Sequence, residues 1–358
     1  MKNFMILAGA RPNFMKIAPL NAVLRARGAG VCIVHTGQHY DQNMSEVFFK
    51  ELAIPEPDLN LGIGSGDRQT QTKKIIDTLV PVLRDRSPDM LIVVGDVTST
   101  AAGAMAGVMA HIPVVHVEAG LRSFNWKMPE ELNRMIADHY SDRLFVNEPS
   151  GLENLKHEGV ADERVHLVGN IMIDTLRRAE PHAAKSNILG VHSLVPRAYG
   201  LLTLHRPENV DQPAVLKALG QTLSIIASRL PLIFPVHPRT KARLVEHGID
   251  LGPRIRLIDP VGYLDMLALT KNAKLALTDS GGLQEETTVL GVPCLTLREQ
   301  TERPITVEVG TSEIVGRDAQ TILNAAERVH RGEWKIGRIP DLWDGRVAER
   351  IADILLNL

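Results

Sequence analysis

The sequence has only two cysteines among its 358 residues, Cys32 and Cys294, and both lie within apolar runs. This number excludes a disulfide framework at this chain length, and cysteines in such runs are usually small core residues. A surplus of one charge is also lacking, because the formal net charge at pH 7 is -2. Broad binding of nucleic acid or of a membrane surface requires a concentrated basic face. We therefore expect a cytoplasmic protein with no nucleic-acid and no membrane partner.

Long apolar runs and several short motifs are missing as well. No apolar stretch reaches the length that crosses a bilayer, and the run at Phe4–Leu7 is too short for the core of a signal peptide. The sequence contains no H-E-x-x-H, no C-x-x-C, no P-loop and no G-x-S-x-G. It therefore predicts neither a metal site nor an esterase-type serine. The first glycine turn, Gly9-Ala10-Arg11-Pro12, is not the G-x-G-x-x-G of a nicotinamide site.

What the sequence does contain is a regular alternation of short apolar runs and longer amphipathic segments. Continuous apolar runs separated by helices indicate parallel sheets that are covered on both faces. The alternation restarts near residue 200, so the predicted fold class is α/β, with two Rossmann-like doubly wound domains facing a central cleft. The predicted domains are residues 1–169 and 170–343, with the boundary at Gly169-Asn170. The predicted strands are Phe4–Leu7, Val31–His35, Met90–Val94, Pro113–Val117, Leu144–Val146, Val165–Val168, Gly200–Leu204, Leu232–Pro235, Ile255–Ile258, Leu275–Thr278 and Pro293–Leu297, and the predicted helices include Ala18–Arg27, Asn43–Leu52 and Thr70–Leu83.

Polar and charged residues follow these predicted strands. Ligands of open parallel sheets bind at the carboxyl ends of the strands, so these positions are the candidate site. In the first half they hold Arg11, Lys16, Asp96 and Glu118, and in the second half His205, His237 and Ser280-Gly281-Gly282. We expect the two sets to line the cleft.

The segment Asp279–Glu286 predicts a strand end, a glycine turn and a helix start. Gly281 and Gly282 allow a ligand to approach the backbone closely, and the free amides of a helix start favour a diphosphate. Glu286 lies one turn into the helix, where its carboxylate could accept hydrogen bonds from ribose hydroxyls. An ordinary strand-to-helix turn that is capped by Ser280 explains these residues equally well.

Three carboxylates, of Asp96, Glu118 and Glu130, come from separate segments of the first half. Removal of a weakly acidic C–H proton requires a base near the carbon and an acid on the opposite face. The alternative for Asp96 and Glu118 is capping of the next helix, and for Glu130 it is the ordinary preference of acids for a first helical turn. His205 and His237 could contact a phosphate or carry a proton, or could be hydrogen-bonded structural residues.

Taken in order, the motifs of this sequence resemble those of the non-hydrolysing UDP-N-acetylglucosamine 2-epimerases. The resemblance spans essentially the whole chain. Its matching stretches are Gly9-Ala10-Arg11-Pro12 with Lys16, Thr36-Gly37-Gln38-His39, Gly95–Thr100, His116–Arg122, Pro129–Arg134, Gly169-Asn170, His205–Asn209, Pro235–Pro238, Asp259-Pro260, Thr278–Glu286, Thr301–Pro304 and Asp344-Gly345.

This resemblance implies a fold of the nucleotide-sugar transferase type B, a homodimer, and a C-terminal helix (344–358) that packs back on the first domain. It implies elimination of UDP across C1–C2 to a 2-acetamidoglucal, followed by re-addition, without metal or other cofactor. The implied proton-transfer residues are Asp96, Glu118 and Glu130, with His205 assisting the diphosphate. The implied substrate-binding residues are Arg11, Lys16, His237, Ser280, Gly281, Gly282, Glu286 and Arg303.

Some motifs depart from the family pattern. In some members a second substrate molecule binds near a Gln-His pair, and Gln38, His39, Gln42 and Arg68 are the counterparts here, with different spacing. The segments Thr36–His39, Leu121–Asn125 and Pro260–Leu264 are also similar to relatives that act on UDP-diacetamido-uronic acids. The sequence further leaves open a hydrolysing epimerase that releases free N-acetylmannosamine, a glycosyltransferase of the same architecture and an inactive nucleotide-sugar sensor.

Overall fold

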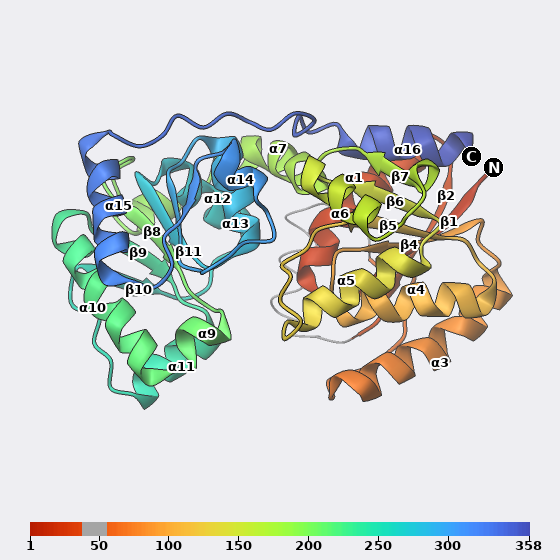
Figure 1. The fold of residues 1–358 in the computed structure, drawn as a ribbon, viewed down its shortest axis with the longest axis horizontal. Coiled ribbons are helices and arrows are strands. Elements are labelled where there is room, and N and C mark those ends of the chain that lie inside the picture. The colour runs from red at the N-terminus through yellow and green to blue at the C-terminus, as the bar shows by residue number, and fades with distance from the viewer. Residues whose placement is uncertain (38–55) are drawn as a thin grey trace. The chain divides into compact units, whose positions relative to one another are not determined.

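The computed structural model describes residues 1–37 and 56–358. The chain divides into two compact units, the first formed by Met1–Arg177 with Asp341–Leu358 and the second by Arg178–Pro340. Each unit contains one parallel sheet with helices packed against it (Figure 1). The prediction of two doubly wound parallel sheets is therefore confirmed.

The sheet of the first unit has the strand order β3-β2-β1-β4-β5-β6-β7. Its strands are β1 (Asn3–Ala8), β2 (Gly30–His35), β3 (Leu59–Asn60), β4 (Met90–Val94), β5 (Val114–Ala119), β6 (Arg143–Val146) and β7 (Val165–Leu167). The helices that the structure describes here are α1 (Arg11–Ala26), α3 (Arg68–Arg86), α4 (Thr98–Ala110), α5 (Pro129–Tyr140), α6 (Pro149–His157), the start of α7 (Ile171–Ala183) and α16 (Val347–Asn357), with a 3-10 turn at Asp162–Arg164.

Helix α4 lies very close to this sheet because small residues face it. A Cβ atom on Gly103 would lie 2.4 Å from the Leu7 side chain, and one on Gly107 would lie 2.4 Å from the side chain of Val114. The strands of the sheet are apolar along their length because helices cover both faces. Close packing of Gly103 therefore fixes the carboxyl ends of β1 and β4, and Gly107 fixes the amino end of β5.

The sheet of the second unit has the strand order β10-β9-β8-β11-β12-β13. Its strands are β8 (Gly200–Thr203), β9 (Leu232–Pro235), β10 (Ile255–Ile258), β11 (Leu275–Thr278), β12 (Cys294–Thr296) and β13 (Ser312–Ile314). Its helices are α8 (Ile188–Val191), α9 (Pro207–Val210), α10 (Pro213–Arg229), α11 (Pro238–Glu246), α12 (Tyr263–Asn272), α13 (Gly281–Leu290), α14 (Ile305–Glu308) and α15 (Ala319–Arg331). Apolar side chains of α10, α15 and the strands form its core.

The start of α7 and the C-terminal segment Asp341–Leu358 pack together in the first unit. Gly169 and Asn170, where the sequence predicts the boundary, lie inside this unit. The returning chain passes so close that a Cβ atom on Gly169 would lie 2.2 Å from the carbonyl oxygen of Leu342. Helix α16 contacts α1, and the Asp174 carboxylate accepts hydrogen bonds from the amides of Val347 and Ala348 at 3.0 and 2.8 Å. The start of α7 and the C-terminal helix thus belong to one packed body.

Local differences from the predicted elements have simple causes. The sequence did not predict β3 or β13, because these edge strands have two or three residues and little apolar character. Helix α1 begins at Arg11 and not at Ala18, since Pro12 suits a first helical turn. The predicted helix Asn43–Leu52 lies outside the described residues. In residues 1–37 and 56–358, no helix combines the length and the apolar character needed to span a bilayer.

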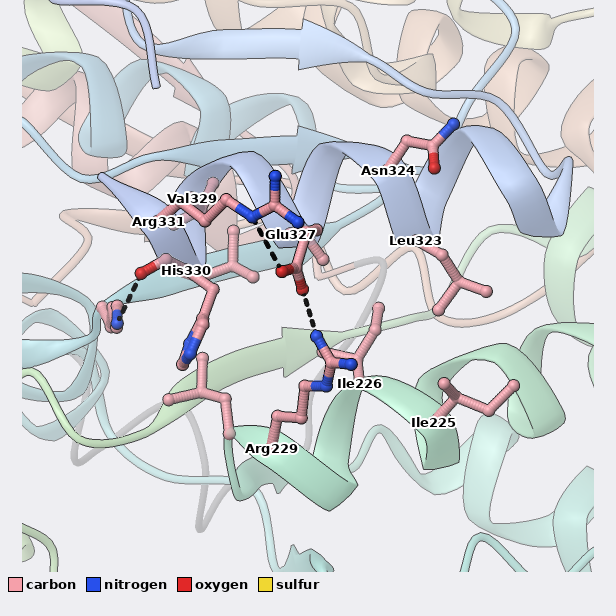
Figure 2. A pocket seen from close by; sticks show the side chains of 13 residues that line it. Ile225, Ile226, Arg229, Leu323, Asn324, Glu327, Val329, His330 and Arg331 are labelled. Carbon is pink, nitrogen blue, oxygen red and sulfur yellow. Dashed lines mark hydrogen bonds and ion pairs between the residues drawn. The ribbon is translucent and has the colours of Figure 1, made fainter. Parts of the chain in front are cut away.

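A cavity of about 380 Å³ lies between α10 and α15 in the second unit (Figure 2). Leu230, Lys274 and Leu275 place it at the amino-terminal edge of the sheet. Arg229 and Arg331 both pair with Glu327 at its rim. The predicted site residues of this unit follow the strands and so lie at the opposite edge of the sheet, away from the described lining of this cavity.

Candidate active site

The strand order of the first sheet reverses between β1 and β4, which is where doubly wound folds bind ligands. The buried side chain of Asn13 joins the two strand ends. Its Oδ1 accepts hydrogen bonds from the amides of Gly9 and Ala10, both at 3.0 Å, and its Nδ2 donates to the carbonyl of Val94 at 3.0 Å. The turn after β1, and with it Lys16 on α1, is thereby held beside the end of β4.

Glu118 lies at the end of β5 in a strained conformation. Its φ is 74°, a region that non-glycine residues rarely adopt, and the pairing of β5 with β6 shifts register at this point. Such strain costs about 1–3 kcal/mol and is typical of functional sites. The carboxylate is 1% exposed and pairs with the Lys16 ammonium at 2.7 Å. A Cβ atom on Gly95 would lie 2.8 Å from Lys16 Nζ, so the glycine leaves room for this pair.

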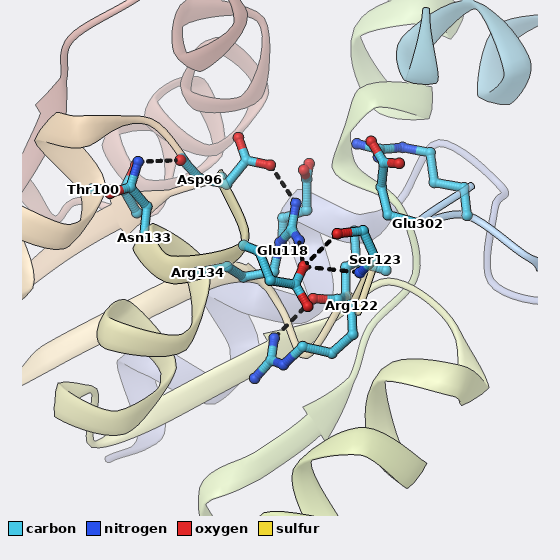
Figure 3. Close-up of polar contacts among 12 residues, drawn as sticks. Asp96, Thr100, Glu118, Arg122, Ser123, Asn133, Arg134 and Glu302 are labelled. Carbon is cyan, nitrogen blue, oxygen red and sulfur yellow. Dashed lines mark hydrogen bonds and ion pairs between the residues drawn. The ribbon is translucent and has the colours of Figure 1, made fainter. Parts of the chain in front are cut away.

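Asp96 follows β4 and is held by two residues of α5 (Figure 3). Its carboxylate is bound by the guanidinium of Arg134. Its carbonyl accepts a hydrogen bond from the Asn133 amide at 2.8 Å, and Arg68 of α3 donates to the same Asn133 side chain at 2.8 Å. Because β4 and β5 are neighbours in the sheet, Asp96 and Glu118 lie at the ends of adjacent strands.

A polar network of largely buried residues packs beside the ends of β4 and β5. His116 contacts Asp138 at 2.6 Å through Nδ1 and the carbonyl of Gly95 at 2.8 Å through Nε2. Arg122 pairs with Asp138 at 2.7 Å and with Glu158 at 2.7 Å. Burial alone would raise the pKa of Asp138, but His116 and Arg122 lower it below its ordinary value. These contacts fix the chain on both sides of Glu118.

The remaining residues predicted for this unit differ in their surroundings. Arg11 begins α1, and its side chain is outside the described part of the structure. Glu130 lies half-exposed on the first turn of α5. Its neighbour Glu131 is instead buried, accepting hydrogen bonds from Ser123 and from the amide of Phe124. Of the residues predicted for a second substrate molecule, Arg68 reaches the Asp96 loop through Asn133, whereas Gln38, His39 and Gln42 lie outside the described residues.

In the second unit the strand order reverses between β8 and β11, and Asp279 joins these two ends. The buried Asp279 carboxylate accepts hydrogen bonds from the amides of His205 and Arg206 and contacts His205 Nδ1 at 2.9 Å. Burial would raise the pKa of Asp279, but His205 and the backbone donors lower it. A carboxylate on Nδ1 fixes the imidazole, so Nε2 of the 42%-exposed His205 ring remains for other contacts.

His237 lies next to His205, with 6.3 Å between the ring centroids. It precedes α11, and its Nδ1 accepts a hydrogen bond from the amide of Arg239 at 3.2 Å. The two histidines, which the sequence predicts from separate strand ends, are therefore brought together.

The glycine turn after β11 begins α13 with Ser280 as the N-cap residue, and the Ser280 side chain makes no cap hydrogen bond. A Cβ atom on Gly282 would meet nothing within 4 Å, whereas one on Gly281 would lie 3.1 Å from the guanidinium of Arg303. The Cα of Gly282 thus borders open space, whereas that of Gly281 lies against the buried guanidinium of Arg303.

Two buried acids of α13 have different partners. Glu285 pairs with Arg303 at 2.6 Å. Burial raises the pKa of Glu286 to about 7, although a hydrogen bond from Tyr263 lowers it and the charge of Glu285 raises it. Glu302 shows the opposite effect, because Arg303, Arg298 and Arg206 outweigh its burial and bring its pKa to about 2.

Sequence reasoning did not identify Asn13, Arg134 or Asp279 as site residues. Asn13 and Arg134 act from within helices, and no strand-end pattern points to them. The spacing of Glu131 and Arg134, three residues apart on a helix, is the signal that could have indicated their pairing.

Comparison with known proteins shows the family and the fold to which this chain belongs. The sequence model of the UDP-N-acetylglucosamine 2-epimerase family matches residues 21–356. The chain is 41% identical to the UDP-N-acetylglucosamine 2-epimerase of Methanocaldococcus jannaschii, and the alignment covers 98% of each chain. It is 38% identical to the UDP-2,3-diacetamido-2,3-dideoxy-D-glucuronate 2-epimerase of Pseudomonas aeruginosa, and that alignment covers 98% of this chain and 99% of the other. It superimposes with a TM-score of 0.90 and 41% identity on a crystal structure of the Methanocaldococcus jannaschii enzyme in complex with UDP-GlcNAc and UDP, covering 100% of both chains. The chain belongs to the UDP-N-acetylglucosamine 2-epimerase family.

Proposed function

We propose that this protein interconverts UDP-N-acetylglucosamine and UDP-N-acetylmannosamine without releasing the sugar from the nucleotide. The observation that carries the proposal is the buried, strained Glu118 carboxylate, paired with Lys16 and one strand away from the arginine-bound Asp96. Two acids at a topological switch point suit a reaction that moves a proton between the two faces of one carbon.

The proposed reaction is an elimination followed by an addition. The C2–H of an N-acetylhexosamine is not adjacent to a carbonyl, so its direct removal would be very costly. One carboxylate takes the C2 proton, the C1–C2 double bond forms, and the C1–O bond breaks so that UDP leaves with the electron pair. Addition of UDP to C1 and of a proton to the other face of C2 gives the epimer. We assign the proton transfers to Asp96 and Glu118, with Glu130 as the third acid. We assign Arg11 and Lys16 to binding of the sugar or the phosphate, and Lys16 also pairs with Glu118.

The second unit supplies the nucleotide-binding residues in this proposal. Amides at Ser280, Gly281 and Gly282 bind the diphosphate at the start of α13. His205, fixed by Asp279, supports the departing phosphate together with His237. Glu286 accepts hydrogen bonds from the ribose, and Arg303 holds the glycine turn through Glu285. By the same family resemblance we propose a homodimer, which light scattering during size-exclusion chromatography would test.

NMR of the reaction in deuterated water tests the proposed function. Incubation with UDP-N-acetylglucosamine should place deuterium at C2 of a sugar that remains linked to UDP. Free N-acetylmannosamine and UDP as the products would instead identify a hydrolysing epimerase. An epimerised sugar without deuterium at C2 would contradict the proposed exchange of the C2 proton with solvent.

The second candidate substrate is a UDP-diacetamido-uronic acid. The observation in its favour is the 38% identity to the Pseudomonas aeruginosa enzyme whose name specifies such a sugar. The same NMR assay with both nucleotides decides between them. A kcat/KM that is higher for UDP-2,3-diacetamido-2,3-dideoxy-D-glucuronate than for UDP-N-acetylglucosamine would replace the first assignment by the second.

A further inference from the structure

Arg134 is a buried cation that pairs with two carboxylates. Its side chain is 2% exposed, and its two terminal nitrogens contact Asp96 and Glu131 respectively, the latter at 3.3 Å. A guanidinium does not lose its proton in proteins, so the charge of Arg134 is permanent. Glu131, also 2% exposed, is held in place by Ser123 and by the amide of Phe124.

Other charged groups around Asp96 come from several elements. Lys16 on α1 lies close to Gly95, and it pairs with Glu118 of β5. His116 of β5 contacts the Gly95 carbonyl, Arg68 of α3 reaches Asp96 through Asn133, and Glu130 belongs to the first turn of α5. Glu131 differs from these groups because it shares with Asp96 the same buried cation.

We infer that Glu131 is a positioning residue that keeps Arg134 paired when Asp96 takes up a proton. This inference rests on the proposed function, in which Asp96 alternates between its charged and its protonated form. Without Glu131, protonation of Asp96 would deprive the buried guanidinium of both carboxylates that pair with it in the described part of the chain, which is strongly unfavourable. Glu131 thus makes both forms of Asp96 accessible while it also anchors the 123–124 turn.

The molecule contains a matched control for this arrangement. Arg122 is likewise 2% exposed and likewise pairs with two carboxylates, those of Asp138 and Glu158. Glu158→Gln therefore removes one of the two partners of a buried arginine, as Glu131→Gln does, without touching the cation that binds Asp96.

The test is a carbon NMR titration of the full chain, carrying aspartate labelled with ¹³C at the carboxyl carbon. The Asp96 signal is assigned by its absence in Asp96→Asn. In Glu131→Gln the midpoint of the Asp96 titration should move to lower pH by on the order of one pH unit, because Arg134 is left with Asp96 alone. Glu131→Asp keeps the charge but moves it back by one methylene, so it should give a smaller shift in the same direction. This variant replaces Glu131→Gln in the titration if Glu131→Gln does not fold.

Equal midpoints in the wild type and the folded Glu131 variants would overturn the inference, as would an equal shift in Glu158→Gln. The titration does not depend on turnover. If the wild type places no deuterium at C2, the proposed function fails. If the wild type does place deuterium at C2, but the Asp96 titration midpoints of the wild type and the Glu131 variants are equal, only the inference about Glu131 fails.

Discussion

The buried pair of Lys16 and Glu118 is the residue-scale feature on which the first unit's site depends. Both side chains are less than 10% exposed, and they meet at 2.7 Å. Removing one partner of a buried ion pair leaves an uncompensated charge and costs about 3–5 kcal/mol, whereas replacing both with uncharged residues costs much less.

We therefore expect Glu118→Gln to lower the free energy of unfolding by about 3 kcal/mol, measured by urea denaturation. The double variant Glu118→Gln/Lys16→Met should recover most of this loss, since neither position then carries a charge. It should not recover epimerisation, because the acid is absent. A double variant whose loss equals the sum of the single losses would show that the two groups do not interact.

Glu286 gives the second residue-scale prediction, because burial raises its pKa from 4.5 to about 7. The folded protein then keeps this proton up to about pH 7, whereas the unfolded chain releases it near pH 4.5. Stability from this group is therefore fully present below pH 4.5 and is lost as the pH rises to about 7.

Glu286→Gln removes this dependence. Relative to the wild type, the free energy of unfolding of the variant should rise by on the order of 3 kcal/mol between pH 4 and pH 8, as followed by urea denaturation. Glu308→Gln, at an exposed position of α14, is the control and should show little change across the same range. An identical difference from the wild type at both pH values would contradict the burial argument.

At the scale of elements, the sequence predicts the described strands other than β3 and β13, because those strands are mostly apolar runs. It also places Asp96 and His205 correctly after strands, whereas Glu118, predicted just after a strand, is the penultimate residue of β5. It cannot predict that Arg134 turns toward Asp96, because a helix presents residues in every direction and packing selects which of them faces the sheet. It also cannot predict the positive φ of Glu118, which coincides with a register shift between β5 and β6.

The turn after β5 offers an element-scale test with a matched pair of glycines. Gly120 and Gly159 have nearly the same φ, 79° and 77°. A Cβ atom on Gly120 would lie 2.5 Å from the carbonyl oxygen of Gly151, whereas one on Gly159 would meet nothing within 4 Å. Only the first substitution must therefore displace backbone.

Gly159→Ala should cost about 1–2 kcal/mol, which is the effect of a left-handed conformation alone. Gly120→Ala should cost clearly more, because α6 must move away from the end of β5. Thermal unfolding of the two variants against the wild type measures the difference. Equal losses would show that the close approach of Gly151 is not a constraint.

At the scale of the whole molecule, the chain forms two units whose sheets share one strand order around a switch point, with β7 as a further edge strand in the first. The first unit is built from two distant stretches of sequence, because Asp174 caps α16 and the returning chain packs against Gly169. The alternation of apolar runs gives no sign of that contact, which only the family resemblance implied, and the predicted boundary at Gly169-Asn170 falls within this unit. The motif order across the whole chain nevertheless indicated the family that the comparisons establish.

The most direct test of the central claim compares Asp96→Asn and Glu118→Gln with the wild type in two measurements. Exchange at C2 of UDP-N-acetylglucosamine in deuterated water, followed by NMR, should fall by at least about 100-fold in each variant. Titration calorimetry should give the wild-type affinity for UDP, because the nucleotide is assigned to the second unit. Exchange at the wild-type rate in either variant, or a parallel loss of UDP binding, would contradict the assignment of proton transfer to these carboxylates.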